Sequence, residues 1–382
     1  MNYHEAVTEL SGIRFTVTYS FYGTEQEALT NAESTCVEQT IEFPPEYLPE
    51  NLFWDAIKGK IERFEKIDEQ HYLARISYAI ETISPDLIQL LNIIYGNIAQ
   101  IRNIRVEDIE FPPEVLAYFK GPRYGLSGVR ELCNVPSRSL ICATLKPMGL
   151  SQESYAQMAY EFALGGSDII KDDHGITNQS FARFEERVSK CAEVILKANA
   201  ETGENSLYAA NVSGPMDQIV SRALFAKQAG AGALLVLPGL VGWDAVRVLR
   251  ENDKIALPIL VHGAYAGIYF ASHQAGLSGK VAFSIIPRLA GADVYIMPNY
   301  IGRLYSTRKE CKDAMEAAKR PMEHIKPIFP GTGGGTTLQT IPALMAFYGK
   351  DVVYIMGGGL HGGVSLVESC RQFRGMLQGE SE

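Results

Sequence analysis

A run of reactive side chains follows an apolar stretch near the middle of the chain. Residues 165–177 read GGSDIIKDDHGIT, so Lys171, Asp173 and His174 come just after two isoleucines. In a strand, side chains two residues apart point the same way, so Lys171 and Asp173 face one side together. Carboxylate and imidazole groups bind metals, whereas an ammonium does not. A buried, neutral lysine, however, reacts with carbon dioxide to give a carbamate, which is an anionic oxygen ligand.

Two interpretations of these residues stay open from the run itself. In the first, a Lys171 carbamate, Asp173 and His174 form a three-ligand metal site with open positions for a substrate. In the second, Lys171 and Asp173 form an ion pair that closes the end of a barrel. Taken alone, the run favours the ion pair by a small margin.

Two glycine runs form a second signal. Gly334 and Gly335 lie in the run that follows one apolar stretch, and Gly357 and Gly358 lie in the run that follows the next. Glycine lets a backbone approach an anion closely. Loops after the last two strands of an eight-stranded barrel often bind phosphate through backbone N–H groups. Either run alone also fits a tight turn, but two consecutive runs indicate a phosphate site.

The sequence pattern after about residue 138 predicts that these residues lie at one end of a barrel. Eight short apolar runs are each followed by a helical pattern: LICATLK, DIIKDD, LYAANVS, ALLVLP, PILVHG, ADVYIMP, IKPIFPG and VVYIMGGG. This alternation predicts an α/β fold with a C-terminal (β/α)8 TIM barrel. A doubly wound sheet usually has a glycine fingerprint after its first strand, and LICATLK has none.

Polar side chains stand at the predicted carboxyl ends of these strands, where the active site of such a barrel lies. They are Thr144, Lys146, Lys171, Asp173, His174, Asn211, His262, Asn299 and, in the loop beyond, Arg303. Scattered surface charges would fall on helix faces instead, so the arrangement predicts one convergent site. His262 fits a general base, although a lone histidine is more often structural.

The first part of the chain mixes strand and helix patterns. GIRFTVTYSF and HYLARISYAI are typical of strands. Residues 49–67 and 84–97 have helical spacing, with Ser84 as the predicted N-cap of the second helix. We therefore expect a smaller N-terminal α+β domain of ferredoxin-like type over residues 1–130 and the catalytic barrel over residues 131–382.

Composition and charge exclude several classes of protein. The 382 residues suit two domains, and the net charge of -9 argues against nucleic acid as a partner. The first ten residues lack a signal pattern, and no uncharged apolar stretch approaches the 18 residues of a membrane span. The six scattered cysteines contain no C-x-x-C motif. We expect a cytoplasmic protein with reduced thiols and no membrane partner.

Several segments together resemble the large subunit of ribulose-bisphosphate carboxylase (RuBisCO). They are RSLICATLKPMGLS, GGSDIIKDDHG, YAANVSG, RLAGADVYIMPNYIGR, VVYIMGGG, AESTC and YGNIAQIRNIRVEDIEFPPE. The resemblance covers nearly the whole chain in the family's order. It implies a small N-terminal domain, a C-terminal barrel, and a homodimer whose active sites form between one chain's barrel and the other's N-terminal domain.

The resemblance also assigns roles to individual residues. Lys171 falls on the family's carbamylated lysine, Asp173 on its metal-binding aspartate and Lys146 on a catalytic lysine. His262 matches the histidine of strand five. The remaining matches are one phosphate site at Gly334, Gly335, Gly357 and Gly358, with Thr144 and Asn211 on the substrate side, and the residues that reach the partner's site, Glu33 and Asn97.

Other positions depart from the family's pattern. His174 stands where carboxylases have a glutamate ligand, and Arg303 replaces the mobile-loop lysine that holds carbon dioxide. A second catalytic lysine is missing at Met148, and the second phosphate site has lost its arginine at Gly263. Ile296 and Gly333 replace a histidine and a serine. The chain therefore resembles the RuBisCO-like, form IV group, which does not fix carbon dioxide.

The resemblance implies an enzyme that enolises a singly phosphorylated keto sugar or keto acid, with an isomerase or decarboxylase outcome. Lys146 or a Lys171 carbamate would be the base, and His262 a second acid or base. The family implies magnesium as the divalent metal, whereas the imidazole of His174 also suits manganese and similar metals.

Three alternatives accompany this hypothesis. His174 hydrogen-bonds to Lys171 in a metal-free sugar-phosphate isomerase, or the chain is a non-catalytic sugar-phosphate binder. Residual carboxylation of ribulose bisphosphate is the third, and Met148, His174, Ile296 and Arg303 argue against it.

Overall fold

The computed structural model describes residues 10–48, 52–302, 304 and 306–379, and the chain divides into two compact units. Unit 1 comprises Met1–Phe119, Ala266–Ile285 and Met322–His324, and unit 2 comprises Lys120–Tyr265, Ile286–Pro321 and Ile325–Glu382. The assignment of residues 1–130 and 131–382 to two family domains stays a prediction. Among the described helices, none has the length and apolar character needed to cross a membrane.

Unit 1 is built on a five-stranded sheet in the order β10-β4-β1-β3-β2. Alternate residues of β1, such as Phe15 and Val17, are fully buried, as expected for a strand with one face on a core. The order of β4, β1, β3 and β2, with α1 and α3 as connecting helices, is the predicted ferredoxin-like arrangement. The strands are β1 Arg14–Tyr22, β2 Lys60–Asp68, β3 His71–Ala79, β4 Ile104–Glu110 and β10 Gly276–Leu277.

The first helix of unit 1 begins at a recognisable cap. Thr24 and Glu27 form a capping box at the start of α1. The helical segments are α1 Glu25–Glu38, η1 Pro45–Tyr47, α2 Leu52–Ile57, η2 Ile80–Thr82, α3 Leu87–Tyr95, η3 Asn97–Gln100, α4 Pro113–Leu116, α11 Gly267–Phe270 and η5 Val281–Ile285.

Two predictions for this unit were wrong. The helix expected over residues 49–67 ends at Ile57, and residues 60–68 form β2, whose backbone pairs with β3. The N-cap of α3 is Asp86 rather than Ser84, because the Asp86 carboxylate accepts hydrogen bonds from two backbone N–H groups of the first turn. Ser84 instead has a positive φ of 48°.

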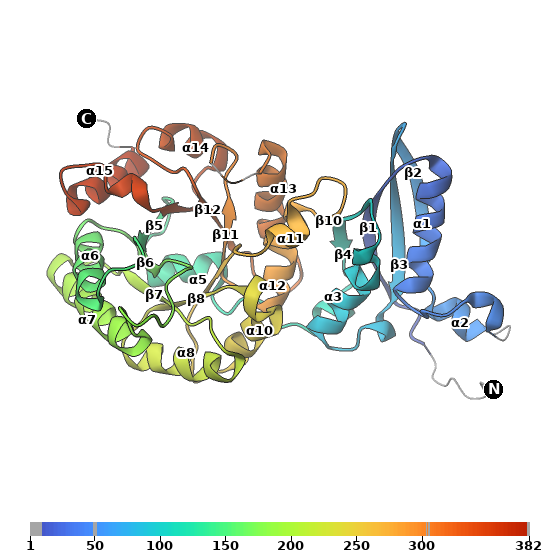
Figure 1. Cartoon of the computed structure of the whole chain (residues 1–382), viewed down its shortest axis with the longest axis horizontal. Helices are drawn as coiled ribbons and strands as arrows, with labels where there is room; N and C mark the ends of the chain where they lie inside the picture. Colours follow the sequence, from blue (N-terminus) through green and yellow to red (C-terminus); the bar gives the residue numbers. More distant parts are fainter. Residues whose placement is uncertain (1–9, 49–51, 303, 305, 380–382) are drawn as a thin grey trace. The chain divides into compact units, whose positions relative to one another are not determined.

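Unit 2 contains the predicted closed barrel of eight parallel strands (Figure 1). Each strand coincides with one of the eight apolar runs of the sequence. The strands are β5 Leu140–Leu145, β6 Ile169–Asp172, β7 Leu207–Asn211, β8 Ala233–Val236, β9 Ile259–His262, β11 Val294–Pro298, β12 Phe329–Gly333 and β13 Val353–Met356.

Helices surround these strands on the outside of the barrel (Figure 1). The helical segments of unit 2 are α5 Gly125–Leu132, α6 Gln152–Leu164, α7 Phe184–Thr202, η4 Met216–Gln218, α8 Ile219–Gln228, α9 Pro238–Val241, α10 Trp243–Glu251, α12 Ile286–Ala290, α13 Arg308–Lys319, α14 Ile341–Tyr348, η6 Gly358–Leu360 and α15 Leu366–Gln378.

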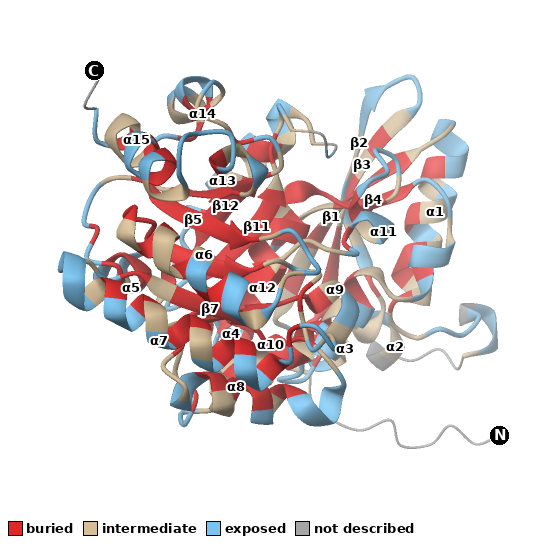
Figure 2. Cartoon of the chain, turned by 60° about the vertical axis from the view of Figure 1, so that its left-hand side comes forward, coloured by how far each residue is buried: buried red, intermediate tan, exposed pale blue. Residues whose placement is uncertain are grey.

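The barrel interior is a packed core (Figure 2). Leu140, Ile169, Leu260 and Phe329 are buried there, and Val129 of α5 belongs to the same cluster. All six cysteines are free, as the sequence predicted, and all six are buried. A rigid core of this kind holds the strand ends, and the side chains that follow them, in place.

Candidate active site

A cavity of about 780 Å³ lies at the carboxyl ends of the barrel strands. Side chains from β5, β6 and β9 meet the glycine loops that follow β12 and β13. Among the predicted site residues, those that line it are Thr144, Lys146, Lys171, Asp173, His174, His262, Gly334, Gly335, Gly357 and Gly358. The barrel therefore brings together groups up to 214 residues apart, as the strand-end argument predicted.

Lys171 is the most buried cation of the cavity, with only 1% of its surface exposed. Its Nζ donates a hydrogen bond to the carbonyl oxygen of Asp172 at 3.0 Å. Burial lowers the pKa of the Lys171 ammonium below its ordinary value of 10.5, and the charge of Lys146 adds to this effect. A larger share of neutral amine follows, which is the form that acts as a base or reacts with carbon dioxide.

Asp173 pairs with Lys146 and not with Lys171. Its Oδ1 lies 3.5 Å from the Lys146 Nζ and 3.2 Å from the His174 Nδ1. No ion pair joins Lys171 to Asp173 within the described residues. Burial raises the pKa of the Asp173 carboxyl, but the His174 hydrogen bond and the two lysines outweigh it and hold that pKa well below its ordinary value.

Two histidine rings form one wall of the site. His174 and His262 stack with centroids 4.6 Å apart and planes at 11°. The His262 Nδ1 accepts a hydrogen bond from the backbone N–H of Ala264 at 3.0 Å, so a neutral His262 carries its proton on Nε2. The His174 Nδ1 donates to the Asp173 carboxylate, so the neutral form of His174 keeps a lone pair on Nε2. Burial, together with the charge of Lys171, holds the pKa of His262 well below 6.5.

A buried polar cluster behind the site fixes the end of β6. Asp172 points to the opposite side of the strand from Lys171, and its carboxylate contacts the Arg187 guanidinium at 3.2 Å. The Tyr208 hydroxyl and the backbone N–H of Asn211 donate to the same carboxylate at 2.8 and 2.9 Å. Asp172 and Arg187 are fully buried. Because every acceptor position of Asp172 is used, the backbone that carries Lys171 and Asp173 is held rigidly.

The two glycine loops present backbone to the cavity. Gly334 and Gly335 have positive φ values of 82° and 109°, which only glycine adopts readily. An added Cβ on Gly357 would lie 3.3 Å from the Lys146 side chain. Outside helices and strands, no hydrogen bond from the N–H groups of Gly334, Gly335 or Gly357 to a described residue is present. These donors suit an anion.

Five predicted residues are not among the described residues that line the cavity. Asn299 is fully buried, and its Oδ1 accepts a hydrogen bond from the backbone N–H of Ile301 at 2.9 Å. Asn211 is fully buried behind the cavity, where its amide donates to the carbonyl oxygens of His174 and Ile176 at 3.1 and 3.0 Å. It orders the loop that carries His174. Glu33 and Asn97 are exposed residues of unit 1. Arg303 lies outside the described residues.

The sequence argument missed several lining residues: Tyr265, Leu304, Thr336 and Thr337. Tyr265 has a positive φ of 69°, and the Thr336 hydroxyl is buried without a hydrogen-bond partner among the described residues. Thr336 directly follows a predicted glycine loop, so its position carried a signal. The strained backbone of Tyr265 gave none.

The donor set fits a divalent metal only with the help of Lys171. No group of three or more His, Cys, Asp and Glu side chains in the described part of the chain is arranged to hold a metal. Asp173 and His174 are adjacent in the chain, and the Asp173 Oδ2 and the His174 Nε2 are available as metal ligands. Lys171 lines the same cavity. A carbamate on Lys171 would supply the third donor, so the residues fit a metal site of the predicted kind.

Comparisons with known proteins agree with this architecture. The family described as ribulose bisphosphate carboxylase large chain, catalytic domain, matches residues 125–369. The chain is 35% identical over 361 residues to ribulose bisphosphate carboxylase-like protein 1 of Rhodopseudomonas palustris, covering 94% of this chain and 96% of that protein. It is 32% identical over 349 residues to 5-methylthioribulose-1-phosphate isomerase of Rhodospirillum rubrum, covering 91% of each.

A solved structure gives the same result for the fold. The crystal structure of a Rubisco-like protein from Rhodopseudomonas palustris superposes with a TM-score of 0.88 at 32% identity, covering 98% of this chain and 99% of that one. The site geometry, the family match and the near-complete coverage lead to one conclusion: this chain belongs to the ribulose bisphosphate carboxylase large-chain family.

Proposed function

We propose that this protein enolises a singly phosphorylated keto sugar or keto acid and does not fix carbon dioxide. The observation that carries the proposal is the meeting of Lys146, Lys171, Asp173 and His262 with two glycine loops in one cavity. The reaction outcome is an isomerisation or a decarboxylation. The relative from Rhodospirillum rubrum, named as an isomerase of a sugar monophosphate, supports the first outcome.

The glycine loops would hold the phosphate. Free backbone N–H groups at Gly334, Gly335 and Gly357 suit an oxyanion. Gly263 and Ile296, which also line the cavity, offer no cation for a second phosphate. A monophosphate therefore matches the charge of this cavity better than a bisphosphate.

The proton transfer would be divided among the buried groups. Lys171, as a neutral amine or a carbamate, removes the proton next to the substrate carbonyl. His262 stays neutral and donates its Nε2–H to a substrate oxygen, because the Ala264 N–H occupies Nδ1. Lys146 is held by Asp173 and adds positive charge beside the developing enolate.

The metal would be held by the Lys171 carbamate, Asp173 and His174. When bound, it would polarise the substrate carbonyl and so acidify the adjacent C–H bond. His174 in place of a carboxylate favours manganese or a similar ion over magnesium.

Hydrogen–deuterium exchange tests the proposal directly. The protein is incubated in D2O with 5-methylthioribulose 1-phosphate, ribulose 1-phosphate or ribulose 1,5-bisphosphate, and proton NMR follows the C–H groups next to the carbonyl. We expect exchange of a monophosphate that disappears in Lys171→Met. Exchange of the bisphosphate alone, or full exchange in Lys171→Met, would contradict the proposal.

A metal-free isomerase is the second candidate, and the histidine pair favours it. The His174 Nε2 retains a lone pair and the stacked His262 carries a proton on Nε2, so the two rings supply a base and an acid side by side. Exchange that persists in a chelator and is lost in His174→Ala would favour this candidate. Exchange that stops in the chelator and returns with manganese would favour the metal enzyme.

We also propose a homodimer with shared sites, in which Glu33 and Asn97 reach the partner's barrel. Both residues are exposed, as this role requires. Glu33→Gln and Lys171→Met variants would each be inactive alone. Mixing them under conditions of subunit exchange should restore part of the activity, because one of the two sites in a hybrid dimer is then intact. No recovery in a verified hybrid would contradict shared sites.

A further inference from the structure

A second cavity lies at the opposite end of the barrel strands. Its volume is about 500 Å³. Its walls come from three segments: the link from α5 to β5, the end of α14 with the link to β13, and the end of α15. Arg138 and Lys350 precede β5 and β13, so this cavity is at the amino ends of the strands. The candidate active site lies at the carboxyl ends, so the two cavities are distinct.

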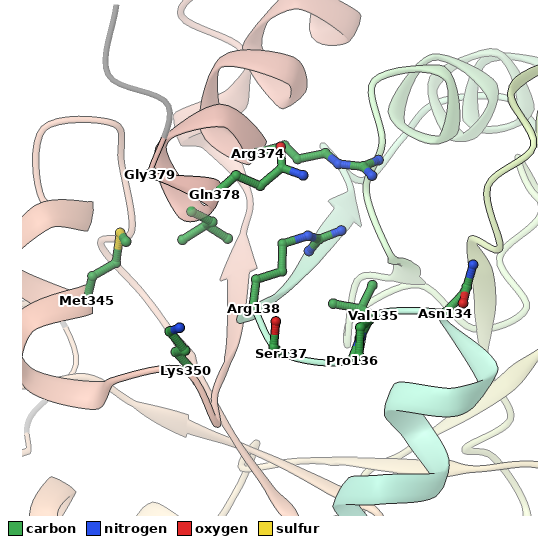
Figure 3. Close-up of a pocket in the computed structure, with 11 residues that line it drawn as sticks. Asn134, Val135, Pro136, Ser137, Arg138, Met345, Lys350, Arg374, Gln378 and Gly379 are labelled. Carbon is green, nitrogen blue, oxygen red and sulfur yellow. The ribbon is translucent and has the colours of Figure 1, made fainter.

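Among the described residues, the lining of this cavity contains three cations and no carboxylate. The cations are Arg138, Lys350 and Arg374. The chain as a whole carries a net charge of -9, so a cavity whose described lining residues include cations but no acidic side chain is unusual for this chain. In Figure 3 the side chains of Arg138, Arg374 and Gln378 extend into the same part of the cavity, and Lys350 stands on another side of it.

Arg138 is held in place from behind. Its Nη1 and Nη2 contact the two carboxylate oxygens of Asp168 at 2.7 Å each, and Nη1 also donates to the Ser139 carbonyl at 2.9 Å. Asp168 is buried and does not line the cavity. A guanidinium has five N–H donors. The Nε–H and one Nη2–H of Arg138 therefore stay available to a ligand.

Arg374 is positioned by two further contacts. Its Nη1 pairs with the Glu204 carboxylate at 2.8 Å. Its guanidinium also lies over Gly166, where an added Cβ would come within 2.6 Å of Nη1. Gly166 also has a positive φ of 83°, so both the backbone conformation and the space beside Arg374 require glycine there. This leaves the Nε and Nη2 edge of Arg374 uncommitted.

Lys350 supplies the unbalanced charge. It is exposed, and no ion pair of its ammonium with a described residue is present, although its carbonyl oxygen accepts from Arg130. The two arginines each have one carboxylate behind them, so the cavity keeps an excess of one positive charge. Ser137 and Gln378 add neutral donors, and Val135 and Leu377 add apolar wall.

We propose that this cavity binds a small organic phosphate. Cationic donors from three chain segments surround a tetrahedral oxyanion better than a planar carboxylate, which one guanidinium already satisfies. The C-terminal end of α15 carries a partial negative charge, which disfavours a bound anion. Charge-assisted hydrogen bonds from the cations are stronger than this effect. The apolar wall accommodates the carbon skeleton of the ester, and the volume falls in the range of small-ligand sites.

Phosphate binding to the full chain tests the proposal. Inorganic phosphate and n-butyl phosphate are titrated by calorimetry at low ionic strength into wild type, into Lys350→Gln/Arg374→Gln, and into Lys254→Gln/Arg371→Gln. The last variant removes the same charge from exposed residues outside the cavity. The glycine loops of the candidate active site provide a second phosphate site, so wild type should bind two phosphates per chain.

We expect the cavity variant to lose one of these two sites, with its affinity reduced roughly tenfold or more for each cation removed. The control variant should retain both. n-Butyl phosphate should bind this site several-fold more tightly than inorganic phosphate, because its alkyl chain is buried against the apolar wall. Lys350→Glu, a change at an exposed position, should weaken the same site without altering the unfolding midpoint.

Three results would overturn the proposal. Equal stoichiometry and affinity in wild type and the cavity variant would show that no phosphate binds there. Equal affinity for acetate and phosphate would make it a general anion site. Equal affinity for n-butyl phosphate and inorganic phosphate would show that the cavity does not recognise the organic part of a phosphate ester.

Discussion

The imidazole rings of His174 and His262 stack 4.6 Å apart in the candidate active site, with complementary hydrogen-bond roles. His174 donates through Nδ1 to Asp173, whereas His262 accepts through Nδ1 from the Ala264 N–H. One ring therefore presents a lone pair and the other a proton. Burial of the His262 ring, together with the charges of Lys171 and His174 beside it, holds the pKa of His262 well below 6.5.

The first prediction concerns pH. Histidine in an unfolded chain titrates near 6.5, while His262 in the folded chain stays neutral to lower pH. Below about pH 6.5 the unfolded chain therefore binds a proton that the folded chain does not. The contribution of His262 to stability is present above that pH and is lost as the pH falls. Denaturant unfolding of wild type and His262→Gln between pH 5 and 8 should show a steeper acid loss in wild type.

NMR of labelled histidine checks the cause. In His174→Ala the pKa of His262 should rise toward its ordinary value, because the stacked ring no longer excludes water or adds charge. An unchanged His262 pKa in this variant would mean that the stack does not control it.

Lys171→Met is expected to separate activity from stability. The substitution removes a buried amine whose only hydrogen bond to a described residue goes to a backbone carbonyl. Enolisation should fall by roughly 10²- to 10⁴-fold, the usual contribution of a general base. The unfolding midpoint should be equal or higher, since no buried charge then needs solvation. A large loss of stability would show that the lysine has a structural role instead.

Breaking the buried pair behind the site should destabilise the fold. Arg187→Met leaves the Asp172 carboxylate fully buried without its cation, at a cost of about 3–5 kcal/mol in the free energy of unfolding. Tyr208→Phe removes one hydrogen bond to the same carboxylate and should cost about 1 kcal/mol. Chemical denaturation measures both, with Arg371→Gln as a surface control. Equal stability of Arg187→Met and the control would contradict this account.

Gly357→Ala should displace Lys146. The new Cβ would meet Cδ and Cε of that lysine at 3.3 Å and Nζ at 3.4 Å. We expect a lower kcat/KM, by roughly tenfold or more, as for other small misplacements of a catalytic group. Gly362→Ala is the matched control, because nothing lies within 4 Å of its added Cβ. Similar kinetics for the two variants would mean that Lys146 has room to move.

His174→Glu should change the metal preference. A carboxylate in place of the imidazole gives an all-oxygen donor set, which magnesium prefers over mixed sets. Calorimetry with magnesium and electron paramagnetic resonance with manganese should show a gain for magnesium relative to manganese. An identical preference in both proteins would indicate that residue 174 is not a ligand.

The barrel and the location of its site were predictable from local patterns. Each barrel strand is an apolar run buried on both sides, and such runs are visible without knowing their neighbours. The carboxyl ends of parallel strands share one end of a barrel, so residues as distant as Thr144 and Gly358 were placed together correctly.

Elements stabilised by pairing rather than pattern were not predictable. β2 has a mostly exposed, charged sequence without clear alternation, and its hydrogen bonds to β3 decide its structure. β10 has two residues and pairs with β4, whose partner residues lie about 170 positions earlier. No local signal distinguishes such a segment from a loop.

The sequence by itself determined which chemical groups meet at the barrel mouth, because strand order and strand ends follow from the chain's periodicity. Only the tertiary structure decided how they interact. Asp173, just after β6, pairs with Lys146, just after β5, instead of with Lys171 of β6. Asn211 holds a loop instead of lining the cavity. These choices depend on side-chain direction and distances of a few ångströms, which are set by the packing of the whole barrel and are not encoded in any short stretch of the chain.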